Sequence, residues 1–362
     1  MKAGPLPETG FLLGTDALNP HPFMLNPAAY LPETAEASFL FLRSQYGNTL
    51  ITNRNGNISQ QENDSSDSFL ALSMHANAGS GLGIGIDYQM YEQEEQNQLS
   101  SRGNTRFTEA YSSRYTAARA VVDITEKVIL GFMIRFLDAE QELVGNFFIN
   151  PSSLTRFKSS LFGTGGGIRI NMDKFQAGGA YLPPMKGRAE IYTEEKIITL
   201  PGIAELSAAY QTGSYGLGAA VRRWLYKQDD RPEGTTLNDE NQSQVNLLGL
   251  NADHNYLFLR EQQQAGIDYK LKNGSLLKLS LSRFSAEFND NPDRDLPGEN
   301  QSNQLIQYLM GHFFFVFIQK NLTLTMGYTR SLNQNIRFVS GSRTIEYKGR
   351  KQNIIAGIQT SL

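Results

Sequence analysis

The sequence contains no cysteine, which excludes disulfide bonds and thiolate metal sites. It has no run of about twenty apolar residues, and this excludes a transmembrane helix. An excess of one charge is also missing, because 36 acidic residues stand against 33 basic ones, so nothing indicates a nucleic-acid partner. Tryptophan occurs once, whereas glycine (33), phenylalanine (21) and tyrosine (16) are abundant. With only 40% hydrophobic residues, this composition favours a barrel with a polar interior.

The segment 127–136 shows the pattern on which the interpretation of the chain depends. Every second residue is large and apolar, and the residues between them include a glycine and an arginine: Val128, Leu130, Phe132, Ile134 and Phe136 alternate with Ile129, Gly131, Met133 and Arg135. A strand that is half buried in a soluble core has this period, and so does a strand between lipid and a barrel lumen. The same alternation recurs at 82–90, 264–271, 322–329 and 354–362.

The connections between the alternating segments decide between these two readings. Six tight turns separate pairs of strands, and seven long polar connections lie between the pairs, at 45–66, 92–112, 138–156, 183–199, 228–260, 289–303 and 333–350. Fourteen strands are predicted. Even strand number with alternating short and long connections is typical of outer-membrane barrels, whose short turns are periplasmic. The predicted fold is therefore an all-β, transmembrane antiparallel β-barrel of fourteen strands over residues 35–362.

Residues 1–34 do not resemble a strand, because six prolines interrupt any hydrogen-bonded ladder. Two apolar groups stand among them, followed by a short motif: Phe11, Leu12, Leu13; Phe23, Met24, Leu25; and Asn26, Pro27, Ala28. We predict that this segment is an irregular hatch or plug in the lumen. The first residues lack the apolar core of a signal peptide, and we expect that a signal was removed.

Three motifs resemble the long-chain fatty-acid outer-membrane transporter (FadL-type) family. The first is Asn26-Pro27-Ala28 before the first strand, and the second runs from Gly165 through Gly178-Gly179-Ala180-Tyr181 to Lys186-Gly187. The third is Leu200-Pro201 followed by two strands and Trp224. The resemblance implies fourteen strands, an N-terminal hatch and passive uptake of hydrophobic molecules. It also implies that ligand leaves sideways through a gap at an irregular third strand.

The predicted third strand, 81–91, is rich in glycine at its start. Gly79 precedes it, and Gly81, Gly83 and Gly85 are expected on its inward face. These glycines have two interpretations: they permit the curvature of the barrel wall, which we favour, or they leave room for a lateral opening.

Three arginines are expected to point into the lumen, Arg119, Arg135 and Arg169. Their expected partners are Asp87, Asp123 and Asp268, or the carboxylate of a ligand, and we favour structural pairing. The four histidines are scattered without metal-ligand spacing, and only His254 lies in a predicted outer loop beside an aspartate. We therefore expect no catalytic site, metal or cofactor.

The sequence as a whole predicts passive transport of hydrophobic small molecules across the outer membrane of a Gram-negative bacterium. The expected partners are outer-membrane lipid, the hydrophobic ligand and, during biogenesis, the barrel-assembly machinery. Two alternatives stay open. The barrel is a surface scaffold or adhesin whose long loops bind a protein, or it is a porin for polar solutes.

Overall fold

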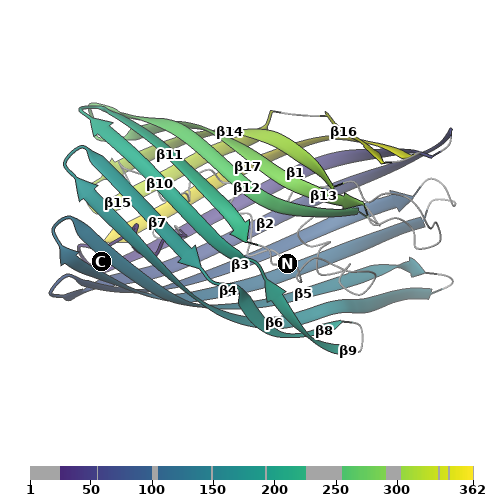
Figure 1. Cartoon of the computed structure of the whole chain (residues 1–362), viewed down its shortest axis with the longest axis horizontal. Helices are drawn as coiled ribbons and strands as arrows, with labels where there is room; N and C mark the ends of the chain where they lie inside the picture. The colour runs from purple at the N-terminus through teal and green to yellow at the C-terminus, as the bar shows by residue number, and fades with distance from the viewer. Residues whose placement is uncertain are drawn as a thin grey trace.

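In the computed structural model the described residues are 25–54, 56–99, 105–147, 150–191, 194–225, 255–290, 303–332, 335–340 and 343–361. Their seventeen strands form one antiparallel sheet, which curves into a barrel (Figure 1). The barrel is closed because β1 (Glu36–Arg54) pairs with both β2 (Asn57–Gly79) and β17 (Arg343–Ser361). Within the described part of the chain, no helix is both long and apolar enough to span a membrane.

The closed ring contains fourteen strand positions, as the sequence predicts, and three of these positions are interrupted strands. The ring runs from β1 to β7, continues with β10 to β15, and returns through β17 to β1. The remaining strands are β3 (Leu82–Leu99), β4 (Thr105–Thr125), β5 (Val128–Phe147), β6 (Asn150–Met172), β7 (Phe175–Leu182), β8 (Met185–Ile191), β9 (Glu194–Leu200), β10 (Gly202–Thr212), β11 (Tyr215–Leu225), β12 (Asn255–Lys270), β13 (Leu276–Asp290), β14 (Asn303–Gln319), β15 (Leu322–Ser331) and β16 (Asn335–Ser340).

Prolines cause two of the three interruptions. Pro183 and Pro184 separate β7 from β8, and Pro201 separates β9 from β10. Proline has no N–H to donate to the ladder, so the strand stops there and resumes beyond. After the break β8 still pairs with β6, so β8 extends the position of β7.

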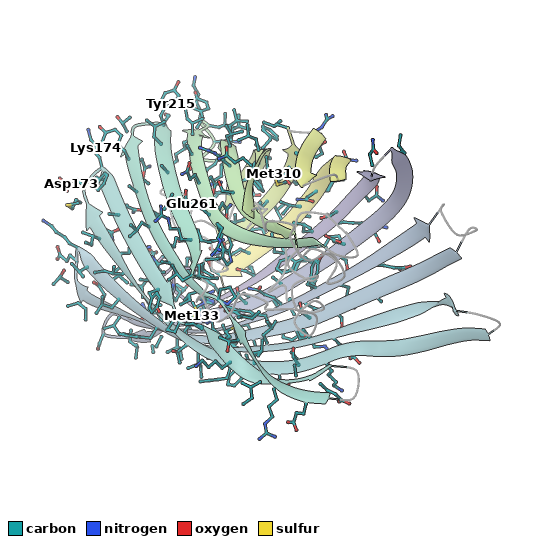
Figure 2. The ribbon with its side chains drawn as sticks, turned by 45° about the vertical axis from the view of Figure 1, so that its right-hand side comes forward. Met133, Asp173, Lys174, Tyr215, Glu261 and Met310 are labelled. Carbon is teal, nitrogen blue, oxygen red and sulfur yellow. The ribbon has the colours of Figure 1, made fainter. Side chains whose placement is uncertain are left out.

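The tight turns lie together at one end of the barrel. Figure 2 shows Asp173, Lys174 and Tyr215 at this end. Several turns contain a residue with positive φ, a conformation that favours glycine: Gly79, Gly81, Gly213 and Gly274, and also Ser80, Asp173 and Lys320. β17 ends here too, because the amide of Ser361 donates to the carbonyl of Asn321 in a tight turn.

The two faces of the wall agree with the predicted alternation. On β5, Phe132 is 57% exposed on the outside, whereas Ile129 and Met133 are buried on the inside. The same division holds for β3, where Ile84 points outward and Asp87 is fully buried. The outward side chains form an apolar belt around the barrel, which a lipid bilayer would cover.

The strands are longer than the sequence analysis predicts, and five of the expected long connections are partly wrong. Residues 45–54 continue β1, and β2 begins at Asn57, so little of the predicted connection 45–66 remains. Strands likewise extend into 92–112, 138–156, 183–199 and 333–350. Beyond the belt both faces are polar, and no alternation marks the extended conformation. Most of 228–260 and 289–303 lies outside the described residues.

Candidate functional site

A short non-strand segment, residues 25–32, lies against the inside of the wall, and we call it the docked segment. Asn26, Ala28, Ala29 and Tyr30 are all buried. Asn26 shapes the segment, because its side-chain oxygen accepts a hydrogen bond from the amide of Ala28 at 2.9 Å. Its Nδ2 donates to the carbonyl of Ile168 on β6 at 3.1 Å. Asn26 therefore both folds the segment and attaches it to the barrel.

The wall under the docked segment is built from glycine, and we call these four residues the glycine seat: Gly83, Gly131, Gly167 and Gly178. A Cβ at Gly131 would overlap the backbone of Pro27 and Ala28. A Cβ at Gly167 would overlap the side chain of Asn26. The segment thus reaches the sheet at a distance that only glycine permits.

The glycines of β3 belong partly to this contact. A Cβ at Gly83 would lie 2.9 Å from both Leu31 and Pro32, and one at Gly85 would lie 2.8 Å from the ring of His75. Gly79 and Gly81 are turn residues with positive φ. β3 pairs with β2 and with β4 from Leu82 to Leu99, so its described residues leave no gap in the wall in this conformation.

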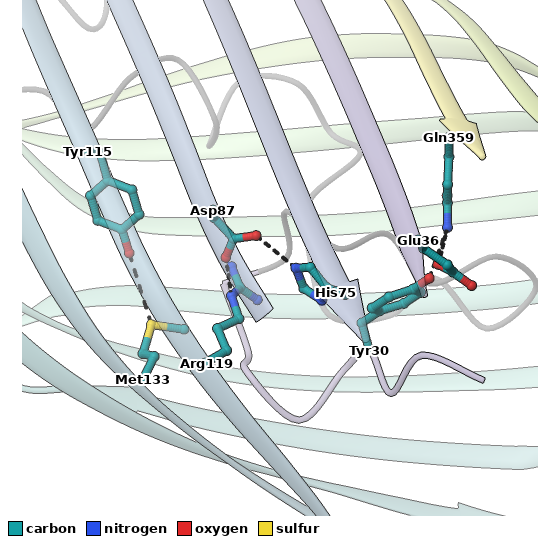
Figure 3. Close-up of polar contacts among 8 residues, drawn as sticks. All are labelled: Tyr30, Glu36, His75, Asp87, Tyr115, Arg119, Met133 and Gln359. Atoms are coloured by element: carbon teal, nitrogen blue, oxygen red, sulfur yellow. Dashed lines mark hydrogen bonds and ion pairs between the residues drawn. The ribbon is translucent and has the colours of Figure 1, made fainter. Parts of the chain in front are cut away.

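Polar and aromatic side chains of three strands fix the docked segment from the side. Arg169 donates a hydrogen bond to the carbonyl of Ala29, and Gln359 donates to the hydroxyl of Tyr30 at 2.9 Å. The ring of Tyr30 meets the ring of His75 edge-on, with centroids 5.4 Å apart (Figure 3). The segment is therefore held by β2, β6 and β17 together.

His75 belongs to a buried charged cluster with Asp87 and Arg119. Nε2 of His75 lies 2.9 Å from Oδ1 of Asp87, and Arg119 forms an ion pair with Oδ2 of the same carboxylate (Figure 3). Asp87 is fully buried. A buried carboxylate requires such partners, because an isolated charge away from water is strongly destabilising.

The other sequence-predicted charges have different partners. Arg135 donates to the carbonyl of Pro183 at 2.7 Å, where β7 is interrupted. Asp268 lies 3.8 Å from Lys278. Oδ1 of Asp123 is buried and accepts no hydrogen bond from the residues that the structure describes. The predicted hatch residues Phe11, Leu12, Leu13, Phe23 and Met24 lie outside the described residues.

Apolar side chains line the lumen on the outer side of the docked segment, and we call them the apolar layer. Along β3 the inward residues progress from Gly83 through Asp87 to Tyr91, and along β5 from Gly131 to Leu137. From the tight turns toward the opposite end of the barrel, the inner wall therefore carries first the glycine seat, then the charged cluster and then the apolar layer. The layer contains Leu40, Leu42, Phe69, Ala71, Tyr91, Tyr115, Ala117, Leu137, Ala139, Leu161, Met185, Ala189, Phe314 and Ile355.

Sequence reasoning missed an ion pair on the opposite wall. Arg222 on β11 donates through Nε and Nη2 to Glu205 on β10, at 3.1 and 2.7 Å, and both side chains are buried. The register of 217–224 is unclear in the sequence, so the inward direction of Arg222 could not be inferred. The described residues contain no group of three potential metal ligands.

Comparison with solved structures identifies proteins that share this fold. A FadL homologue of Pseudomonas aeruginosa superposes with a TM-score of 0.62 at 10% identity, covering 98% of each chain. The toluene transporter TodX of Pseudomonas putida gives 0.61 at 11% identity, covering 99% of this chain and 98% of the other. The CymD monoaromatic hydrocarbon channel gives 0.54 at 10% identity, covering 99% and 97%.

Comparison at the level of sequence gives nothing further: no protein-family model matches the chain, and no curated protein does. The structural likeness extends over nearly the whole chain. At these identities it establishes the fold, and the fold expected from the three FadL-type motifs is confirmed.

Proposed function

We propose that this chain is a passive outer-membrane channel for hydrophobic small molecules and that it carries out no catalysis. The carrying observation is the apolar layer inside a closed barrel, on the outer side of the docked segment. A polar-solute porin has no need of an apolar lumen. A hydrophobic molecule, in contrast, gains free energy on leaving water for such a surface.

The docked segment suggests how passage is controlled. Residues 1–34 act as a hatch whose attached end is the Asn26–Tyr30 region. Ligand collects in the apolar layer, and movement of the hatch opens the way onward. In our proposal the ligand leaves sideways near β3, after movement of the hatch has withdrawn Leu31 and Pro32 from Gly83.

The test is uptake of a radiolabelled long-chain fatty acid, and separately of toluene, by cells that produce the barrel. Leu137→Gln combined with Leu161→Gln introduces two amides into the apolar layer, where both leucines are buried. Uptake should fall about tenfold or more, because burial of one leucine side chain contributes ~1.5–3 kcal/mol. Gln89→Leu is the matched control. It makes the reverse change, from an amide to an apolar side chain, at a buried position that faces the same lumen. Unchanged uptake by the double variant contradicts the proposal.

The surface scaffold is the second candidate, and the length of the strands favours it. β2 and β6 each have 23 residues, about twice what a tilted strand needs to cross the bilayer, ~9–11 residues. Deletion of residues 1–34 separates the two functions. A hatch-gated channel then conducts continuously in planar bilayers, whereas a scaffold keeps both its partner binding and its low conductance.

A further inference from the structure

The outer edge of the apolar belt carries exposed arginines on four alternating strands, and we call them the arginine arc: Arg223 on β11, Arg283 on β13, Arg330 on β15 and Arg43 on β1. These strands all run away from the tight turns. From the first residue of the strand to the arginine the chain advances eight, seven, eight and seven residues, respectively. The four side chains therefore stand at nearly one height.

The register of the sheet supports this common height. Gln263 lies opposite Arg283, and Arg330 lies opposite Gln352. Arg223 lies opposite Glu261, which is two residues from Gln263 on β12. The arc thus shifts about one residue for each strand that it crosses. A shift of this size is what a strand tilt of ~35–45° produces along a level line.

The arginine arc carries only positive charge, and most of this charge has no acidic partner among the described residues. Arg43 and Arg330 form no ion pair or side-chain hydrogen bond within the described part of the chain. Glu261 is the carboxylate of this sector, and it accepts a hydrogen bond from Nε of Arg223 at 2.6 Å. Across the barrel the exposed charges at the end of the belt are of both signs, with Glu92 on β3, Arg114 on β4 and Asp138 on β5.

An apolar surface lies directly beneath each arginine on the same strand. Leu279 and Leu281 precede Arg283 and are 54% and 46% exposed, and Met326 precedes Arg330 and is 61% exposed. A ligand that satisfies both surfaces must carry an anionic headgroup and long apolar chains. Guanidinium groups bind phosphate oxygens in bidentate geometry, which lysine cannot reproduce.

We propose that the arginine arc is a binding site for the phosphorylated headgroup of an outer-leaflet lipid, whose acyl chains lie on the belt below. The orientation rests on the proposed location in the outer membrane, where the tight turns are periplasmic. The occupant is a lipid rather than free phosphate because the arc continues into exposed apolar surface. Binding holds this sector of the wall at a fixed depth in the outer leaflet.

The experiment measures binding of lipid A to the purified full chain in non-ionic detergent, by native mass spectrometry. The probes are lipid A with both phosphates, the same lipid after removal of its phosphates, and inorganic phosphate. The test variant combines Arg43→Gln, Arg283→Gln and Arg330→Gln and leaves the Arg223–Glu261 pair intact. The matched control combines Lys127→Gln, Lys174→Gln and Lys272→Gln, three exposed lysines of the tight turns.

The test variant should lose about tenfold to a hundredfold in affinity for phosphorylated lipid A, and the control should bind as the wild type does. Dephosphorylated lipid A should bind weakly to all three proteins, and inorganic phosphate should not compete at millimolar concentration. Equal binding by the test variant and the wild type overturns the inference, and so does equal binding of dephosphorylated lipid. Heat-dependent gel migration checks that each barrel is folded, and single variants replace the triple variant where it is not.

Uptake of hydrophobic solute by the same variants separates this inference from the proposed function. Loss of lipid binding with intact uptake supports the arc as a lipid site. Intact lipid binding without any solute uptake by the wild type contradicts the transport function and leaves the lipid site standing.

Discussion

Two regions of the inner wall differ in how they use small residues and buried charge. The wall of β3 to β7 carries the glycine seat, and its glycines meet the backbone or the side chains of the docked segment. On the far wall, β10 to β15, glycine leaves room for side chains, as at Gly327, which accommodates the ring of Phe314. The first wall is shaped around another part of the chain, whereas the described glycines of the far wall meet only neighbouring parts of the barrel. We infer that control of passage is built into one side of the barrel.

The largest expected effect comes from removing a buried carboxylate from each wall. Asp87→Ala leaves Arg119 and His75 without their shared partner, and Glu205→Ala leaves Arg222 without its ion-pair partner. Each should lower the free energy of unfolding by ~3–5 kcal/mol. Urea titration in lipid vesicles, followed through the fluorescence of the single tryptophan, measures this. Only Asp87→Ala should also raise hydrogen exchange in the docked segment, and equal exchange in both variants contradicts the difference between the walls.

Outside the barrel the two walls should respond alike. Phe132→Arg and Leu279→Arg place a charge on the belt at positions that are 57% and 54% exposed. Each should lower the free energy of unfolding by ~2–4 kcal/mol, because lipid does not solvate the charge. The same urea titration compares them. A much larger loss for one of the two would show that the asymmetry extends to the lipid face.

A single methyl group should distinguish the walls more finely. Gly131→Ala pushes a Cβ into the backbone of Pro27 and Ala28, and overpacking of this kind costs about 1–3 kcal/mol. Gly311→Ala is the control, because its Cβ would meet Leu332 at 3.6 Å, an ordinary contact. Planar-bilayer recordings should show more frequent openings for Gly131→Ala alone. Silent recordings for both variants would mean that the docked segment does not govern conductance.

The smallest effect concerns one hydroxyl group. Tyr30→Phe removes the hydrogen bond from Gln359 to the Tyr30 hydroxyl and should lower stability by ~0.5–1.5 kcal/mol. Tyr328→Phe removes an exposed hydrogen bond to Gln352 and should change stability less. Hydrogen exchange at Ala29 and Tyr30 reports the first effect directly. Equal behaviour of the two variants would mean that Gln359 does not hold the segment.

The sequence predicts those features of the fold that contact with lipid requires. Lipid demands an apolar residue at every outward position, which is every second residue of a strand, so the faces of 127–136 follow from the period. The number of strands follows from the period together with the turns. The lengths of the strands do not, because residues such as 57–66 are polar on both faces and resemble a loop. Hydrogen bonding between neighbouring strands keeps them extended, and that pairing leaves no signal in a single sequence.

The glycine seat could not be predicted for a related reason. Gly131 and Gly167 look like ordinary inward positions of a barrel, and their role depends on the segment that lies over them. Asn26-Pro27-Ala28 is recognisable as a motif, but its contacts with the wall join residues more than a hundred positions apart. The pair of Glu205 and Arg222 is likewise a property of register, since the two residues are direct cross-strand partners.

The length of the strands has a consequence for where the channel begins. At ~3.3 Å per residue, the 23 residues of β6 extend roughly 75 Å along the strand, which a tilt of ~40° reduces to a height of roughly 55–60 Å. The hydrocarbon layer accounts for only ~25–30 Å of this height. The rim therefore extends well beyond the hydrocarbon layer, into the region of the lipid headgroups and their sugars, and a hydrophobic solute is expected to enter the lumen from that level.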